Sequence, residues 1–401
     1  MENQQPVAFN VMVKPVGPTC NLGCAYCYYL KKSAYYQEQR LMMSESLLDA
    51  FTRQYIQAQQ VPAVDFSWQG GEPLLAGLPF FAQAIALQQK YARPGLTVGN
   101  NLQTNGVLLT EAWCHFLKEH DFLVGVSLDG PGPLNDRFRR NKAGRPVFQQ
   151  VMRGVSLLRK HGVRFNVLSC VSAANAAHPL EVYRFYRDRV KARFIQFIPV
   201  VNRPVASHYD EGTELTEHTV SPEAYGRFLV EIFDEWVRRD IGRVYVQPFD
   251  VALSAWFGQS PALCVHEKVC GKAMVLEHNG DLYACDHFVE PACLLGRVPD
   301  QALLDLALGE RQTRFGLAKQ DTQPEACRSC PYLFACQGGC PKERFVPTSA
   351  PGQRANHLCA GYQAFFAHID EPMRWMADLL GQHRPPAEIM ARMKKLPRKH
   401  P

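Results

Sequence analysis

The chain has 401 residues, of which 46% are hydrophobic and 20% are charged, and its formal net charge is +6. These values are typical of a globular protein with a sizeable core and leave room for two or three domains. The polar start, Met1–Pro6, lacks the basic and apolar regions of a secretory signal, and no apolar run is long enough to span a bilayer. We therefore expect a cytoplasmic protein, whose thiols stay reduced.

The first half of the chain alternates apolar, β-rich runs with helical patterns. Strands are expected at residues 9–16, 63–68, 96–103, 122–128, 164–171 and 193–200, and helices at 44–59, 79–92, 110–120, 147–160 and 178–190. Ser44 and Thr110 are typical helix start signals. The continuously apolar runs suit a parallel sheet covered on both faces, and the period of about 30 residues suits βα units. Six such units form either an open doubly wound sheet or an incomplete barrel, and periodicity does not separate the two.

Polar motifs follow five of these strands. They are Cys20, the QGGEP run at 69–73, QTNG at 103–106, SLDG at 127–130 and QFIP at 196–199. Ligand sites gather at the carboxyl ends of parallel strands, so all five motifs are expected on one rim. In QGGEP the two glycines would let the backbone approach a small ligand closely, and Glu72 would add a fixed acceptor. A plain tight turn is the alternative interpretation.

The second half of the chain has a different composition. A polar loop at 202–222 precedes an amphipathic helix at 222–240 and a short strand at 244–247, and dense cysteine begins at Cys264. We expect a domain boundary near 240–260. Residues 360–380 and 386–395 have helical patterns. The basic end at 392–399, with Lys394, Lys395 and Arg398, lacks an aromatic platform and is interpreted as a solvated tail rather than a nucleic-acid site.

Three of the fourteen cysteines, Cys20, Cys24 and Cys27, have the spacing CxxxCxxC. Cysteine thiolates ligate iron–sulfur clusters, and three of them would hold three irons of a 4Fe–4S cluster. The fourth iron would then lack a nearby protein ligand. An open metal position is typical of a catalytic site.

A second group contains eight cysteines, enough for two sites with four ligands each. They are Cys264, Cys270, Cys285, Cys327, Cys330, Cys336, Cys340 and Cys359. Small loop-rich segments are commonly held together by metal. Zinc and iron–sulfur clusters both remain open here, because ligand spacing does not fix the metal.

Other candidate residues receive simpler interpretations. Cys114 and Cys170 are expected to pack in the core, and Cys293 is given no role. His266 and His287 can ligate metal, although eight cysteines already suffice. Beside the first thiol group, Tyr28 and Tyr29 either line a substrate channel or pack across the mouth of the barrel.

These motifs carry a family resemblance over roughly residues 9–375. CxxxCxxC with Tyr26, followed by GGEP at 70–73, resembles the radical S-adenosylmethionine superfamily, and the later cysteines resemble its SPASM extension. The runs HNGDLYACDHFV from His278 and CQGGCPKERF from Cys336 resemble the anaerobic sulfatase-maturating enzymes. The resemblance implies an α/β fold, with a partial (β/α)6 TIM-like barrel followed by a cysteine-rich SPASM domain that holds two auxiliary iron–sulfur clusters. The domains would be 1–240, 241–375 and a helical, basic tail at 376–401.

The resemblance also implies cofactors and ligands. Cys20, Cys24 and Cys27 would hold a 4Fe–4S cluster whose open iron takes the amino and carboxylate groups of S-adenosylmethionine. Further contacts to this cofactor are implied at Tyr26, Gly71, Ser127, Arg139 and about Val201. Two auxiliary 4Fe–4S clusters, which bring the total to three, are implied at two ligand sets: Cys264, Cys270, Cys285 and Cys340, and Cys327, Cys330, Cys336 and Cys359.

The implied reaction is the oxidation of a sulfatase cysteine or serine to Cα-formylglycine. A 5′-deoxyadenosyl radical would take hydrogen from the substrate Cβ, Asp286 would act as general base, and an auxiliary cluster would accept the remaining electron. A carboxylate that caps a turn is the alternative interpretation of Asp286. The implied partners are an unfolded or nascent sulfatase polypeptide and a low-potential electron donor such as flavodoxin or ferredoxin, with no nucleic acid and no membrane.

Two other functions compete with this one. A SPASM-type peptide maturase would form thioether or carbon–carbon crosslinks in a precursor peptide with the same clusters. A zinc-stabilised binding module would have no redox chemistry, and iron and acid-labile sulfide analysis would distinguish it from both enzymes.

Overall fold

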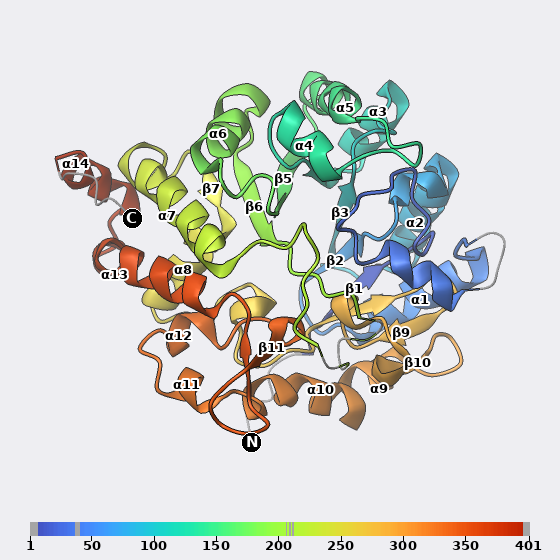
Figure 1. Ribbon diagram of the computed structural model, residues 1–401. Coiled ribbons are helices and arrows are strands. Elements are labelled where there is room, and N and C mark those ends of the chain that lie inside the picture. Colours follow the sequence, from blue (N-terminus) through green and yellow to red (C-terminus); the bar gives the residue numbers. More distant parts are fainter. Residues whose placement is uncertain (1–6, 37–40, 206, 208–209, 211, 396–401) are drawn as a thin grey trace. The chain divides into compact units, whose positions relative to one another are not determined.

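The computed structural model describes residues 7–36, 41–205, 207, 210 and 212–395 (Figure 1). The expectations for Met1–Pro6 and for Arg398 in the basic tail lie outside these residues. The chain divides into two compact units, each assembled from segments that are separated in the sequence. Unit 1 comprises residues 1–127, 139–165 and 270–318, and unit 2 comprises residues 128–138, 166–269 and 319–401.

Four parallel strands form the centre of unit 1. They are β1 (Asn10–Val13), β2 (Ala63–Trp68), β3 (Thr97–Thr104) and β4 (Leu123–Ser127), paired in that order. The helices of unit 1 that connect or follow them are α1 (Glu45–Ala58), α2 (Leu78–Tyr91), α3 (Glu111–Glu119) and α5 (Phe148–Lys160). Ser44 accepts a hydrogen bond from the Leu47 amide, and Thr110 accepts one from the Trp113 amide. Both expected helix starts are therefore confirmed as side-chain caps.

The cysteine-rich part of the sequence extends this same sheet. β8 (Ala273–Leu276) pairs in parallel with β1. Beyond β8, β9 (Asp281–Tyr283) and β10 (Leu294–Arg297) add antiparallel strands at this end of the sheet (Figure 1). The sequence did not predict these strands, because each has only three or four residues and β8 pairs with a strand far away in the chain. As a result, residues 277–286, which follow β8, are attached through β8 to β1, the strand that precedes Cys20.

Unit 2 contains a second set of parallel strands. β5 (Arg164–Val171), of which residues 166–171 belong to this unit, pairs with β6 (Phe194–Pro199), and β6 pairs with β7 (Tyr245–Val246). One helix was expected at residues 178–190, but α6 (Pro179–Arg184) changes at Phe185 into the π-helical segment η3 (Phe185–Val190). Lys191, in the left-handed region at φ 61°, ends it.

Two long helices, α7 (Pro222–Arg239) and α13 (Cys359–Gly381), pack closely in unit 2 (Figure 1). Glycines permit this approach: a Cβ on Gly226 would lie 2.7 Å from the Gly361 carbonyl oxygen, and a Cβ on Gly361 would lie 2.1 Å from the Pro222 carbonyl oxygen. Real Cβ atoms do not come this close to backbone atoms. The two glycines therefore set the distance between the helices.

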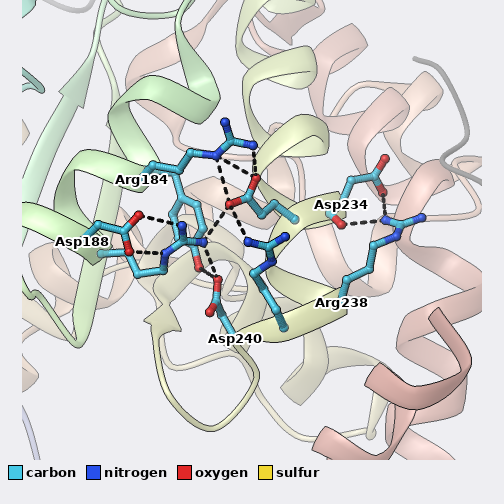
Figure 2. Close-up of polar contacts among 9 residues, drawn as sticks. Arg184, Asp188, Asp234, Arg238 and Asp240 are labelled. Carbon is cyan, nitrogen blue, oxygen red and sulfur yellow. Dashed lines mark hydrogen bonds and ion pairs between the residues drawn. The ribbon is translucent and has the colours of Figure 1, made fainter. Parts of the chain in front are cut away.

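An ion-pair network joins the π-helical segment to α7 within unit 2 (Figure 2). The fully buried Glu235 carboxylate accepts hydrogen bonds from Arg184 and from Arg187 Nη1, the latter at 2.7 Å. Arg187 also donates to Asp188 and to Asp240, and Tyr183 donates to Asp240 at 2.8 Å. This network satisfies the buried carboxylates, as burial of a charge requires.

The remaining described elements are mostly short. They are η1 (Leu30–Tyr35), η2 (Pro73–Ala76), α4 (Gly132–Phe138), α8 (Gln247–Trp256), η4 (Cys264–His266), η5 (Asp286–Phe288), η6 (Pro291–Cys293), α9 (Leu303–Leu308), α10 (Glu310–Asp321), α11 (Glu325–Arg328), α12 (Leu333–Cys336), η7 (Pro341–Glu343), β11 (Arg344–Pro347), β12 (Arg354–Asn356), η8 (Pro386–Glu388) and α14 (Ile389–Met393). β11 and β12 form an antiparallel pair. Among the described residues, the helices lack the combination of length and apolarity needed to cross a bilayer.

Candidate active site

The first thiol group lies in the loop after β1, in unit 1. The Cys27 amide donates to the Cys24 carbonyl at 3.0 Å, and the Leu22 amide donates to Cys20 Sγ at 3.4 Å. Burial, together with the nearby Glu72 and the Cys24 and Cys27 thiols, raises the pKa of Cys20 to about 11. A bound cation would reverse this effect by stabilising the thiolates. The donor set therefore fits iron, which thiolates ligate.

The QGGEP run brings backbone atoms close to this loop. Gly71 has φ 54°, and a Cβ there would lie 2.1 Å from the Thr19 carbonyl oxygen. Gly70 has φ 118°, and a Cβ there would lie 2.6 Å from Lys14 Cγ. Both the backbone conformation and the close contacts require glycine. More than a plain turn is present, because the two glycines pack against the thiol loop and against Lys14.

Glu72 anchors the end of β2 to the end of β3. Its side chain is fully buried, and it accepts hydrogen bonds from the Leu74 amide at 3.1 Å, from Thr104 Oγ1 at 2.8 Å and from the Asn105 amide at 2.8 Å. Burial raises the pKa of Glu72 to about 7, although these hydrogen bonds lower it. Asn105 also donates to Asn21 at 2.7 Å, so the ends of two strands hold the cysteine loop.

Four of the five residues expected to contact S-adenosylmethionine lie in unit 1. Buried Arg139 donates to the Tyr26 hydroxyl at 2.7 Å, and Ser127 Oγ accepts from Gln103 at 2.9 Å. Gly71 lies in the turn described above. Val201 is buried in unit 2, two residues after β6 ends. Contact of all five with the cofactor stays a prediction.

Asp286 begins the short helix η5, directly after Cys285, and it forms an ion pair with a buried lysine. Lys14 Nζ, at the end of β1, lies 2.5 Å from Asp286 Oδ1, and the Tyr28 hydroxyl donates to Asp286 Oδ2. Burial by itself raises the pKa of Asp286, but Lys14 together with His287 and Tyr28 brings the pKa below its ordinary value. The carboxylate is therefore ionised at neutral pH.

Tyr29 and Glu277 hold Lys14 in this position. Its side chain is 1% exposed, and Nζ lies 3.9 Å from the centre of the Tyr29 ring, a cation–π contact. The Tyr29 hydroxyl donates to the buried Glu277 carboxylate at 2.6 Å. Of the two interpretations left open for Tyr29, packing is therefore the one the structure supports. Lys14 was missed in the sequence, although a lysine at the end of an apolar strand was an available signal.

Cys270 and Cys285 lie in unit 1, where one side chain bridges their neighbours. Gln312 Nε2 donates to the Gly271 carbonyl at 2.8 Å and to the Ala284 carbonyl at 3.2 Å. Their two predicted co-ligands, Cys264 and Cys340, lie in unit 2. There Lys319 Nζ donates to the Cys264 carbonyl at 2.8 Å, and Asn356 donates to the Cys340 carbonyl at 3.2 Å.

The other four predicted ligands lie together within unit 2. Cys327, Cys330, Cys336 and Cys359 all line one small cavity, whose wall also includes Tyr332, Tyr362 and Phe366. Burial, together with the other three thiols, raises the pKa of Cys336 to about 12. Four converging thiols with apolar surroundings fit a four-cysteine metal site.

The simpler interpretations can also be compared with the structure. His266 is buried between the rings of Tyr362 and Phe366, and burial lowers its pKa to about 4. Its Nδ1 lies 3.3 Å from the Cys336 carbonyl oxygen, a contact to the backbone. Cys114 is fully buried, which confirms its expected place in the core.

Known protein families match most of the chain. Residues 15–185 match the radical SAM superfamily, where SAM is S-adenosylmethionine, and residues 264–331 match the SPASM iron–sulfur cluster-binding domain. A serine-type anaerobic sulfatase-maturating enzyme from Bacteroides thetaiotaomicron is 46% identical, over 96% of this chain and 95% of that protein. A cysteine-type enzyme from Clostridium perfringens is 31% identical over 90% of this chain and 95% of that protein.

Solved structures give the same result for the fold. A structure titled native anSMEcpe with bound AdoMet and Cp18Cys peptide matches with a TM-score of 0.83 and 29% identity, covering 93% of this chain and 100% of that one. Streptococcus suis SuiB bound to precursor peptide SuiA matches with a TM-score of 0.61 at 15% identity, over 88% of this chain and 76% of that one, a likeness of fold alone.

The matches confirm the expected α/β fold, a partial (β/α)6 barrel followed by a cysteine-rich domain. Identity above 40% over nearly the full length of both chains reaches well beyond the three-cysteine motif that many radical SAM enzymes share. The chain belongs to the anaerobic sulfatase-maturating enzymes of the radical SAM superfamily.

Proposed function

We propose that this protein oxidises a serine of a sulfatase polypeptide to Cα-formylglycine. Serine-type relatives from Bacteroides thetaiotaomicron and Klebsiella aerogenes are 46% and 40% identical to this chain, whereas cysteine-type relatives from Clostridium perfringens and Clostridium novyi are 31% and 29% identical. This difference supports serine as the preferred residue over cysteine. The polypeptide is bound in an unfolded or nascent state, because its target side chain must reach a site beside Cys285.

Three 4Fe–4S clusters and S-adenosylmethionine are the proposed cofactors. The first cluster is held by Cys20, Cys24 and Cys27, with S-adenosylmethionine contacted by Tyr26, Gly71, Ser127, Arg139 and Val201. The auxiliary clusters take Cys264, Cys270, Cys285 and Cys340, and Cys327, Cys330, Cys336 and Cys359. When bound, the first cluster and S-adenosylmethionine supply a 5′-deoxyadenosyl radical that takes one hydrogen atom from the substrate Cβ. The cavity lined by Cys327, Cys330, Cys336 and Cys359 supports this assignment.

The protein's own contribution is to remove a proton. Conversion of a serine CH₂–OH group to an aldehyde removes one hydrogen atom, one proton and one electron. Asp286 accepts the hydroxyl proton, since Lys14 and Tyr28 keep the Asp286 carboxylate ionised and oriented. Loss of the Cβ hydrogen makes the hydroxyl far more acidic, so a carboxylate of low pKa is a sufficient base. Cys285, the neighbour of Asp286, would ligate an auxiliary cluster, and that cluster would supply an acceptor for the electron.

The observation that carries the proposal is the contact of Asp286 with Lys14 and Tyr28 beside Cys285. The test is mass spectrometry of sulfatase-derived peptides that differ only in serine or cysteine, after anaerobic incubation with reductant and S-adenosylmethionine. Loss of two hydrogen atoms from the serine peptide is expected, with less turnover of the cysteine peptide. A crosslinked product, or turnover of the cysteine peptide alone, would contradict the proposal.

The cluster assignment has a separate test. About twelve irons and equivalent acid-labile sulfide are expected per reconstituted chain, four for each cluster. Cys24→Ala is expected to abolish cleavage of S-adenosylmethionine, whereas a chain with Cys327→Ala should lose about four irons. Zinc without sulfide would favour the zinc-stabilised binding module instead.

A low-potential donor such as flavodoxin or ferredoxin is the proposed source of electrons. Replacement of the chemical reductant by each reduced protein tests this assignment.

A further inference from the structure

Three metal-ligating side chains meet outside the site described above, where α3 and α5 pack in unit 1. Glu111 and His115 lie on α3, and His161 caps the end of α5. One donor atom of each residue lies within 4.8 Å of the other two. Glu111 and His115 are four residues apart and so share one face of α3.

Caps and a turn hold the backbone on either side of these residues. Thr110 caps α3 directly before Glu111. The His161 amide donates to the Leu157 carbonyl at 3.0 Å, and Gly162, with φ 62°, turns the chain away immediately afterwards. The ring centres of His115 and His161 are 4.6 Å apart, with their planes at 70°. The two imidazoles therefore contact each other, and His161 also contacts the Glu111 carboxylate.

The two carboxylate oxygens of Glu111 have different partners. Lys160 Nζ lies 2.7 Å from Oε1, and His161 Nε2 contacts Oε2. Lysine and histidine together lower the pKa of Glu111, which keeps the carboxylate ionised. With Oε1 engaged by Lys160, Oε2 faces the imidazoles. A carboxylate with one oxygen on a metal and the other hydrogen-bonded is a common arrangement in metal sites.

We propose that Glu111, His115 and His161 bind a zinc-type divalent cation. Two imidazole nitrogens and one carboxylate oxygen are donors that Zn²⁺ accepts, and water would complete the tetrahedral coordination. Lys160 orients the carboxylate and also reduces the affinity through its charge. A bound ion would link α3 to α5, at a surface that the proposed reaction does not use. The proposal is independent of the proposed function.

The test is zinc binding to the reconstituted holoenzyme, measured by equilibrium dialysis against Zn²⁺ and elemental analysis. His115→Ala is expected to bind one zinc ion fewer per chain than the wild type. Its affinity at this site should fall by more than the roughly 10- to 100-fold seen when a residue that only contacts a metal ligand is replaced. His120→Ala is the matched control, because His120 ends the same helix and packs on Phe116 outside the cluster. All three proteins carry the same cysteines, so differences between them report this site.

Thermal unfolding provides a second measurement. Added Zn²⁺ is expected to raise the Tm of the wild type and of His120→Ala, and to raise it less in His115→Ala, because a ligand stabilises the state that binds it. Equal zinc content in the wild type and His115→Ala would overturn the proposal. An equal loss in His120→Ala would overturn it as well.

Discussion

Two carboxylates, Glu235 in unit 2 and Asp286 in unit 1, both form ion pairs with basic side chains but differ in burial and in partners. Glu235 is fully buried between Arg184 and Arg187, with hydrogen bonds of 2.6–3.1 Å (Figure 2). Asp286 is 14% exposed and contacts Lys14 and the Tyr28 hydroxyl. In both, burial raises the pKa, and the cations overcome that effect and lower it.

The difference lies in what each set of partners allows. Arginine stays charged and presents a rigid fork of donors, so the Glu235 network joins α7 to the π-helical segment and leaves the carboxylate little freedom to take a proton. Asp286 keeps part of its surface accessible and follows Cys285 directly. A low pKa therefore does not by itself distinguish a structural carboxylate from a candidate base, whereas the partners and the neighbouring thiol do.

Asp286→Asn is expected to have the largest effect on the reaction. Loss of a general base typically costs about 10²- to 10⁴-fold in rate, so formylglycine should fall by that factor while cleavage of S-adenosylmethionine continues. Quantification of 5′-deoxyadenosine and of formylglycine in the same sample measures both. Glu235→Gln is the matched control, a buried carboxylate replaced by its amide. Wild-type formylglycine yield from Asp286→Asn would remove the base assignment.

Glu235→Gln is expected to reduce stability rather than chemistry. Removal of one partner from a buried ion pair costs about 3 kcal/mol, at the low end of the usual range because Arg184 is half exposed. Denaturant unfolding followed by circular dichroism measures the change. Formylglycine formed per folded molecule should equal that of the wild type. A specific loss of product at unchanged stability would end the distinction between the two carboxylates.

Lys14→Met is expected to change how the yield of formylglycine per cleaved S-adenosylmethionine depends on pH. Without the ammonium, burial dominates and raises the pKa of Asp286, so the carboxyl becomes protonated as pH falls through the raised value. The ratio of formylglycine to 5′-deoxyadenosine should then decline toward acidic pH, whereas in the wild type, with its lowered pKa, it should stay flat between about pH 6 and 8. An identical flat profile in Lys14→Met would show that Lys14 does not control the ionisation of Asp286.

Tyr28→Phe is expected to give the smallest change. It removes one hydrogen bond to a charged group. Such a bond is worth about 1.5 kcal/mol, which corresponds to a roughly tenfold change in the rate of formylglycine formation. The same ratio, measured against pH, should show a smaller shift than in Lys14→Met, because the ammonium remains. Tyr29→Phe is the neighbouring control, since Tyr29 donates to Glu277 rather than to Asp286. A larger shift in Tyr28→Phe than in Lys14→Met would reverse the proposed ranking of the two partners.

Much of the fold was predictable because it depends on local patterns. Apolar runs and start signals predicted β1 to β6 and the caps at Ser44 and Thr110. The change at Phe185 from α-helix to π-helix was not predictable, since both have similar local patterns. The domain boundary expected near residues 240–260 stays a prediction.

The sequence by itself determined which chemistry the chain carries, because ligand type and spacing are local properties. The features that determined it are the spacing of Cys20, Cys24 and Cys27 and the number of later thiols. Tertiary structure alone decided what surrounds Asp286. Tyr28 is 258 residues away in the chain, and Lys14 reaches Asp286 because β8 returns to pair with β1. Such contacts depend on how distant strands pair, and strand periodicity does not encode the choice of partner.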